Sequence, residues 1–212
     1  MSLRSAAVAK ILATCLCLPG TALAIDGQRL ITHAAALRGG VTPGDTPGFP
    51  VSITQSGSYR LATNLDIPVN RDGLLIRANN VTIDLNGWRI SGRQARHGVA
   101  VLMSYGSVTV RQGVIAGFTS SGIMGLGSGL IVENVQISNV STGIMGGNAL
   151  MVIGSEVSHS GNGVVCQEAC HISGSSFRVN SSTAVLMASG VVLDSTFRDN
   201  AGYAIASSSG KT

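Results

Sequence analysis

The chain has 212 residues, of which 44% are hydrophobic, 11% are charged and only 4% are aromatic, and its formal net charge is +4. This hydrophobic content excludes an intrinsically disordered chain, and the length favours a single domain. No apolar run reaches the roughly 18 residues of a membrane-spanning helix, and no block of basic residues supports nucleic-acid binding.

The segment 1–24 has the layout of a secretory signal peptide. Arg4 and Lys10 form a basic start, an apolar stretch covers residues 11–18, and the Ala-Leu-Ala of residues 22–24 suits a cleavage site. Cleavage after Ala24 leaves a mature chain, 25–212, with twelve basic and ten acidic side chains. The sequence therefore predicts an exported protein, either periplasmic or extracellular.

Residues 25–74 are assigned to an N-terminal cap and lead-in strands. Apolar positions between Leu30 and Leu37 fit one short amphipathic helix, three prolines in 43–50 mark a loop, and residues 51–54 fit a strand. We expect this segment to cover the first open end of the repeats at 75–212. The single tryptophan, Trp88, is expected to pack under this cap.

The rest of the chain is built from short repeats of nearly constant length. One apolar position recurs at almost equal intervals: Val110, Val132, Val152, Ile172 and Val192. A second apolar position follows each of these at a fixed offset: Ile115, Ile137, Val157, Phe177 and Phe197. Leu85 and Ile90 form an earlier, looser copy. A third apolar track opens the units: Val99, Ile123, Ile144, Val164, Val185 and Ala204.

Within each unit the alternation is that of a β-strand. Apolar and polar residues alternate, as at 81–85 (VTIDL), and Gly, Ser and Asn occupy the breaks. Strands of this kind, stacked about 4.8 Å apart, predict an all-β parallel solenoid of about six coils. A sandwich of hairpins is disfavoured, because Asn86-Gly87 is the only two-residue hairpin turn of its type between alternating runs.

Residues 81–87 (VTIDLNG) and repeats such as 130–139 (LIVENVQISN) resemble the right-handed parallel β-helix repeats of the pectate-lyase-like superfamily. The lead-in at 57–61 (GSYRL), with Asn64-Leu65, is similar to that of exported bacterial members without an assigned activity. The resemblance covers about residues 50–212 and implies a right-handed β-helix. It selects no reaction, because relatives include lyases, hydrolases, epimerases and pure binders.

Stacking turns equivalent positions into surface rows, and two rows flank the second apolar track. Both rows are expected to face water, and they bring together the polar candidates Gln136, Glu156, Arg178 and Arg198. Glu156 and Arg178 lie diagonally on adjacent coils, within reach of an ion pair. The guanidinium fork matches carboxylates, so the arginines are candidates for binding an acidic sugar polymer. A solvated face, or a catalytic arginine with a cation held by Glu156, are the alternatives.

Three further features of the repeats carry predictions. An apolar row on the opening strand, here called the apolar stripe, is expected to point outward and to be covered by a partner, a second copy or the chain's own N-terminal segment: Ala100, Met124, Met145, Val165, Leu186 and Ile205. The alternative is that the strand phase slips and that some of these residues belong to the core. Aligned turn residues are expected to be structural: Ser155, Ser175 and Ser195, with Asn180 and Asn200. Cys166 and Cys170 predict a local disulfide in an oxidising compartment, with free thiols or a metal site that includes His171 as the alternatives.

The residue pattern contains little that indicates catalysis. No two of the ten acids occupy equivalent rows on adjacent coils, and no acidic cluster suits calcium. The sequence therefore predicts an exported, non-catalytic β-helix that binds a polysaccharide or an envelope protein, with no cofactor and no nucleic-acid partner. A lyase or epimerase of uronate polymers, which would use calcium, is one alternative. A structural protein that self-associates through the apolar stripe into a homo-oligomer is the other.

Overall fold

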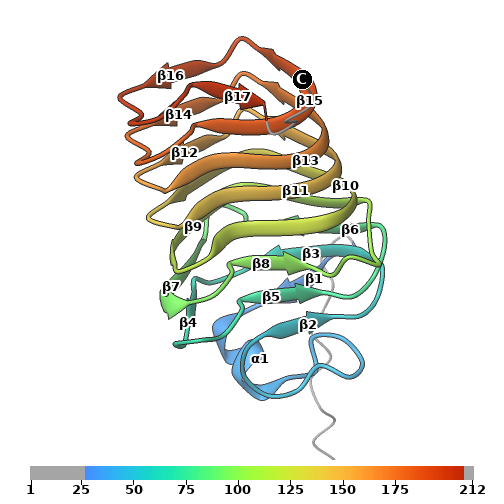
Figure 1. Cartoon of the computed structure of the whole chain (residues 1–212). Helices are drawn as coiled ribbons and strands as arrows, with labels where there is room; N and C mark the ends of the chain where they lie inside the picture. The colour runs from blue at the N-terminus through green and yellow to red at the C-terminus, as the bar shows by residue number, and fades with distance from the viewer. Residues whose placement is uncertain (1–26, 208–212) are drawn as a thin grey trace, which may run out of the picture.

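The computed structural model describes residues 27–207, so the expected signal segment lies outside the described residues. The chain winds into a right-handed parallel β-solenoid of about seven coils (Figure 1). The sequence predicted about six coils. The additional one, coil 1, lies at residues 51–67, inside the segment assigned to the cap and lead-in strands. Coils 2 to 7 follow in chain order at residues 74–95, 99–118, 121–138, 142–158, 162–178 and 185–198.

The strands stack on three faces of the solenoid, numbered in the order in which each coil enters them. The first face holds β2 (Val51–Ile53), β5 (Leu74–Ile76), β8 (Val99–Val101), β17 (Ile205–Ser207) and the opening segments of the long strands β10 (Ser121–Ser138), β11 (Thr142–Ile153), β13 (Asn162–Ser173) and β15 (Val185–Leu193). The second face holds β1 (Arg29–Ile31), β3 (Gly57–Leu61), β6 (Val81–Asp84), the opening of β9 (Val108–Phe118) and the later segments of β10, β11, β13 and β15. The third face holds β4 (Leu65–Ile67), β7 (Arg89–Ala95), the ends of β9 and β10, β12 (Glu156–Ser158), β14 (Ser176–Arg178) and β16 (Thr196–Arg198).

The register confirms the two main apolar tracks from Val110 onward. The five residues from Val110 to Val192 stack on one another, as do the five from Ile115 to Phe197. All but Val192 and Phe197, on the last full coil, are buried. The interior is therefore a column of stacked aliphatic and phenylalanine side chains, which removes apolar area from water in every coil.

Two positions of the predicted tracks are wrong. Ile83, and not Leu85, stacks on Val110, because the turn through Asn86 and Gly87 contains two residues more than the later turns. The third track ends on Ile205 and not on Ala204, since Ile205 is the partner of Val185.

The N-terminal cap contains less helix than expected. Arg29–Ile31 forms strand β1, stacked on β3, and helix α1 covers only His33–Arg38, with the Thr32 hydroxyl accepting from Ala35 N at 3.0 Å. The loop that follows α1 is tied to coil 1, because Ser52 N donates to Asp45 Oδ1 at 2.7 Å. Among the described residues, no helix is long and apolar enough to cross a membrane.

Trp88 does not pack under the cap. It lies in the turn between β6 and β7, and 38% of its surface is exposed.

The predicted serine and asparagine rows form ladders between coils. Ser155 N donates to Ser175 Oγ, and Ser175 N donates to Ser195 Oγ, both at 3.2 Å. The Asn180 amide nitrogen donates to Asn200 Oδ1 at 2.9 Å and to Val157 O at 3.2 Å. Both ladders satisfy backbone groups that would be left buried and unpaired in the corners of the solenoid.

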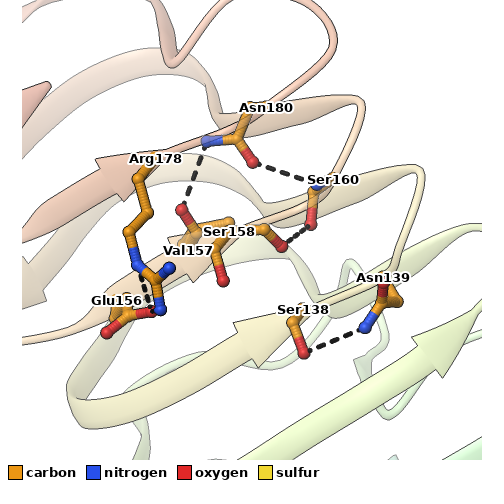
Figure 2. A network of polar contacts seen from close by, with 8 residues as sticks. All are labelled: Ser138, Asn139, Glu156, Val157, Ser158, Ser160, Arg178 and Asn180. Atoms are coloured by element: carbon orange, nitrogen blue, oxygen red, sulfur yellow. Dashed lines mark hydrogen bonds and ion pairs between the residues drawn. The ribbon is translucent and has the colours of Figure 1, made fainter. Parts of the chain in front are cut away.

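Replacing Asn180 with alanine is expected to lower the free energy of unfolding by about 2 kcal/mol. Asn180 is buried, and its Oδ1 accepts from Ser160 N at 3.1 Å, so the substitution leaves that N–H without its acceptor and removes the side-chain bond to Val157 O (Figure 2). Urea unfolding measures the change. The exposed neighbour Ser181→Ala is the control, and equal losses in the two variants would show that the asparagine ladder contributes nothing specific.

Candidate functional site

The third face carries the predicted polar residues, and its register confirms both rows. One row stacks Arg89, Val114, Gln136, Glu156, Ser176 and Thr196. The other stacks Asp66, Ser91, Ala116, Ser138, Ser158, Arg178 and Arg198. Both rows flank the buried track on the short strands, so they project away from the interior. The expectation that every member faces water is wrong for two members of the second row, because Ala116 is only 7% exposed and Ser158 only 4%.

Glu156 and Arg178 form the expected diagonal ion pair. Arg178 leans across to the neighbouring coil (Figure 2), and its Nε and one terminal nitrogen donate to Glu156 Oε1 at 2.9 and 2.6 Å. The side chains are 45% and 32% exposed, so the pair contributes at most about 1 kcal/mol to stability. Its main effect is to occupy two N–H groups of Arg178.

Arg198 is the more available of the two stacked arginines. Its side chain is 81% exposed, and its nearest carboxylate oxygen, Asp199 Oδ2, is 3.8 Å from Nε. Gln136, stacked beside Glu156, is also exposed. The C-terminal part of the third face therefore presents one available guanidinium, one engaged guanidinium and an amide.

A cavity of about 700 Å³ opens at the N-terminal end of the same face, outside the residues predicted from the sequence. Its lining comes from β4, β7 and the residues that follow β4: Asp66, Ile67, Pro68, Val69, Arg89, Ser91 and Arg93. Ser91 Oγ donates to Asp66 Oδ1 at 2.6 Å, which orients that carboxylate along the face. Within residues 27–207, no carboxylate lies within ion-pair distance of Arg89 or Arg93.

One signal in the sequence identifies part of this cavity. Arg89 and Ser91 flank Ile90 as Glu156 and Ser158 flank Val157, so extending the polar rows by one further coil finds both. Arg93 has no such signal, because it lies in the bulge of β7 between Ser91 and Ala95. Two guanidinium groups beside one carboxylate give the cavity a local excess of positive charge, which suits an anionic ligand.

The apolar stripe is continuous but ends differently from the prediction. Ala100, Met124, Met145, Val165 and Leu186 stack on one another, and the last four are half-buried on the outside of the first face. Ile205 belongs to the inward track instead, and Ala206 is the partner of Leu186. Both differences at this end have one cause, which is that Ile205, and not Ala204, stacks on Val185.

Cys166 and Cys170 are both free, buried thiols in this structure, so the disulfide stays a prediction. His171 lies in an outward row between Met151 and Val191, on the opposite side of the strand from its buried neighbour Cys170. Among the described residues, no three His, Cys, Asp or Glu side chains gather closely enough to hold a metal ion.

His97 lies between β7 and β8 and is half-buried. Burial lowers the pKa of its imidazole, and Asp72 opposes the shift only in part. His97 Nδ1 accepts a hydrogen bond from Ser121 N at 3.3 Å, so the neutral ring satisfies a backbone N–H of the next coil. The Asp72 carboxylate is paired with the Arg96 guanidinium, with 2.6 Å between Oδ2 and a terminal nitrogen. We therefore assign His97, Asp72 and Arg96 a structural role.

No family model, no curated protein and no solved structure matches this chain.

Proposed function

We propose that the protein is an exported, non-catalytic β-helix that binds a linear, carboxylate-bearing polysaccharide along its third face. The observation that carries the proposal is the placement of Arg89 and Arg198 on one continuous outward face, with a cavity at its N-terminal end. The resemblance of the repeats to pectate-lyase-like β-helices, which act on or bind such polymers, supports the same substrate class.

The spacing of the solenoid suits a repeating ligand. Five coil intervals separate Arg89 on coil 2 from Arg198 on coil 7, which corresponds to about 24 Å at the usual strand spacing. One strand spacing is close to the length of one sugar residue, so successive sugars meet successive coils. Between the arginines the face offers serine hydroxyls, Gln136 and Thr196, which hydrogen-bond sugar hydroxyls.

The same face argues against hydrolysis by paired carboxylates. Its two acids, Asp66 and Glu156, lie on coils 1 and 5, about 19 Å apart at the usual strand spacing, whereas glycosidases need their carboxyl groups within about 10 Å. Glu156 is also engaged by Arg178, which weakens the case for a cation or base at that position. Binding without turnover is therefore the interpretation that the geometry supports best.

Isothermal titration with polygalacturonate tests the proposal, and its methyl ester is the matched uncharged polymer. We expect binding of the acid form that weakens with added salt, and little binding of the ester. The Arg89→Ala/Arg198→Ala variant is expected to lose about 2 kcal/mol, or roughly 30-fold in Kd. Arg77→Ala, which removes an exposed arginine of coil 2 outside the third face, is the control and should bind normally.

Three outcomes would overturn the proposal. Equal losses in the control and the double variant would show that binding is not located on the third face. Release of unsaturated uronates, seen as new ultraviolet absorbance, would make the protein a lyase. Failure to bind any polymer, together with a size that grows with concentration, would favour self-association through the apolar stripe.

A further inference from the structure

In coils 4 and 5, one large inward side chain fills the corner between the first and second faces, whereas coil 3 fills it with two buried valines, Val101 and Val108. In coil 5, Gly146 faces Leu150, and a Cβ added to Gly146 would lie 2.7 Å from the Leu150 Cδ2 atom. In coil 4, Gly125 faces Leu130 with the same geometry at 2.9 Å. In coils 4 and 5 the corner is therefore filled by a leucine that packs directly over a glycine.

The next coil fills this space with two sulfur atoms. The register stacks Cys166 on Gly146 and Cys170 on Leu150, so the two thiols share the volume that one leucine occupies below. In coil 7 the corner again has one long side chain and one glycine, because Met187 stacks on Cys166 and Gly190 stacks on Cys170. Cys166 and Cys170 are 1% and 4% exposed. Close packing at this corner therefore holds the two sulfurs against each other.

We propose that Cys166 and Cys170 are a redox pair that closes into a disulfide across this corner when the protein meets a disulfide oxidant. The reaction consumes two cysteine thiols and one oxidant disulfide, and it yields one protein disulfide and two oxidant thiols. The proposal is independent of polysaccharide binding, because the corner lies between the first and second faces.

The hydrogen bond between the thiols sets the order of the two steps. A side-chain hydrogen bond between the two thiols lowers the pKa of Cys166 and raises that of Cys170. The Cys166 thiolate therefore attacks one sulfur of the oxidant, forms a mixed disulfide and releases one thiolate. Cys170 then loses its proton and attacks Cys166 Sγ, which forms the protein disulfide and releases the second thiolate of the oxidant.

The intervening segment provides the route for the oxidant. Gln167, Glu168 and Ala169 are exposed, and the strand register shifts between Cys166 and Ala169. A bulge disrupts the hydrogen-bond ladder locally, so this part of β13 opens more easily than the regular strand on either side.

Mass spectrometry of the full chain after treatment with oxidised glutathione tests the proposal. Tryptic cleavage after Arg111 and Arg178 leaves both cysteines in one peptide, residues 112–178, which separates them from Cys15 and Cys17. We expect this peptide to become about 2 Da lighter and to resist alkylation, and dithiothreitol should reverse both changes. The melting temperature of the chain should rise by about 5 °C on oxidation.

The Cys166→Gly/Cys170→Leu variant is the matched control, because it copies the Gly146 and Leu150 corner of coil 5. Because Cys15 and Cys17 are present in both proteins, any effect of their oxidation is shared. The rise in melting temperature that is specific to Cys166 and Cys170 should be absent from the variant. Two glutathione adducts on the wild-type peptide, or two thiols that remain alkylatable after unfolding, would overturn the proposal. Neither readout depends on the variant folding, because both are measured on the wild-type chain.

Discussion

Replacing Gly143 with alanine is expected to lower the free energy of unfolding by about 3 kcal/mol. Gly143 opens the first-face strand of coil 5, where the backbone of coil 6 approaches closely. A Cβ at this position would lie 2.4 Å from Gly163 O and 2.4 Å from Val157 Cγ1. The first of these atoms is backbone and the second belongs to a buried side chain, so neither moves without disturbing the stack. Urea unfolding followed by circular dichroism measures the loss.

The equivalent position two coils later supplies the control. Ala184 precedes Val185 as Gly143 precedes Ile144, and it is fully buried, so this site accommodates a methyl group. Ala184→Gly should cost about 1 kcal/mol, from the lost methyl and the added backbone freedom. A Gly143→Ala variant as stable as the wild type would contradict the close approach of coils 5 and 6.

Replacing Phe177 with alanine is expected to lower the free energy of unfolding by about 4 kcal/mol. Phe177 is fully buried, stacks against Phe197 with ring centroids 5.4 Å apart, and has Val157 on its other side. Truncation would leave a cavity between two coils whose backbones are held at the strand spacing, so the site cannot collapse. Thermal and urea unfolding both report this change.

The Phe197→Ala variant is the control, because it also removes a phenylalanine ring but from a position that is only half-buried. Phe197 is only half-buried on coil 7, so its truncation should cost less than half as much. Since each coil of a solenoid contacts only its neighbours, both variants should leave the N-terminal coils unaffected in hydrogen exchange. Equal destabilisation by the two substitutions would contradict the burial difference between these coils.

The regular repeat by itself determined most of the architecture from Val110 onward. In a parallel in-register stack, residues one period apart become neighbours in space, so a sequence alignment of the repeats is also a contact map. This is why the two main inward tracks, the Ser155 and Asn180 ladders, and the diagonal pair of Glu156 and Arg178 are confirmed.

Only the tertiary structure decided the features that depend on turn length. The two extra residues at Asn86 and Gly87 shift the phase of coil 2, so that Ile83 and not Leu85 stacks on Val110. The cavity also needs Arg93, which lies in the bulge of β7 and matches no position of the rows. Coil 1 carries no clear repeat and is recognised by its pairing with coil 2. A one-residue difference moves Ile205 from the apolar stripe to the inward-facing track, where it stacks on Val185 at the exposed end of the solenoid, because adjacent residues of a strand point to opposite sides. Within a periodic segment, the sequence alone determines which residues face inward. Which residues of successive strands stack on one another depends on how many residues each turn contains and how it folds.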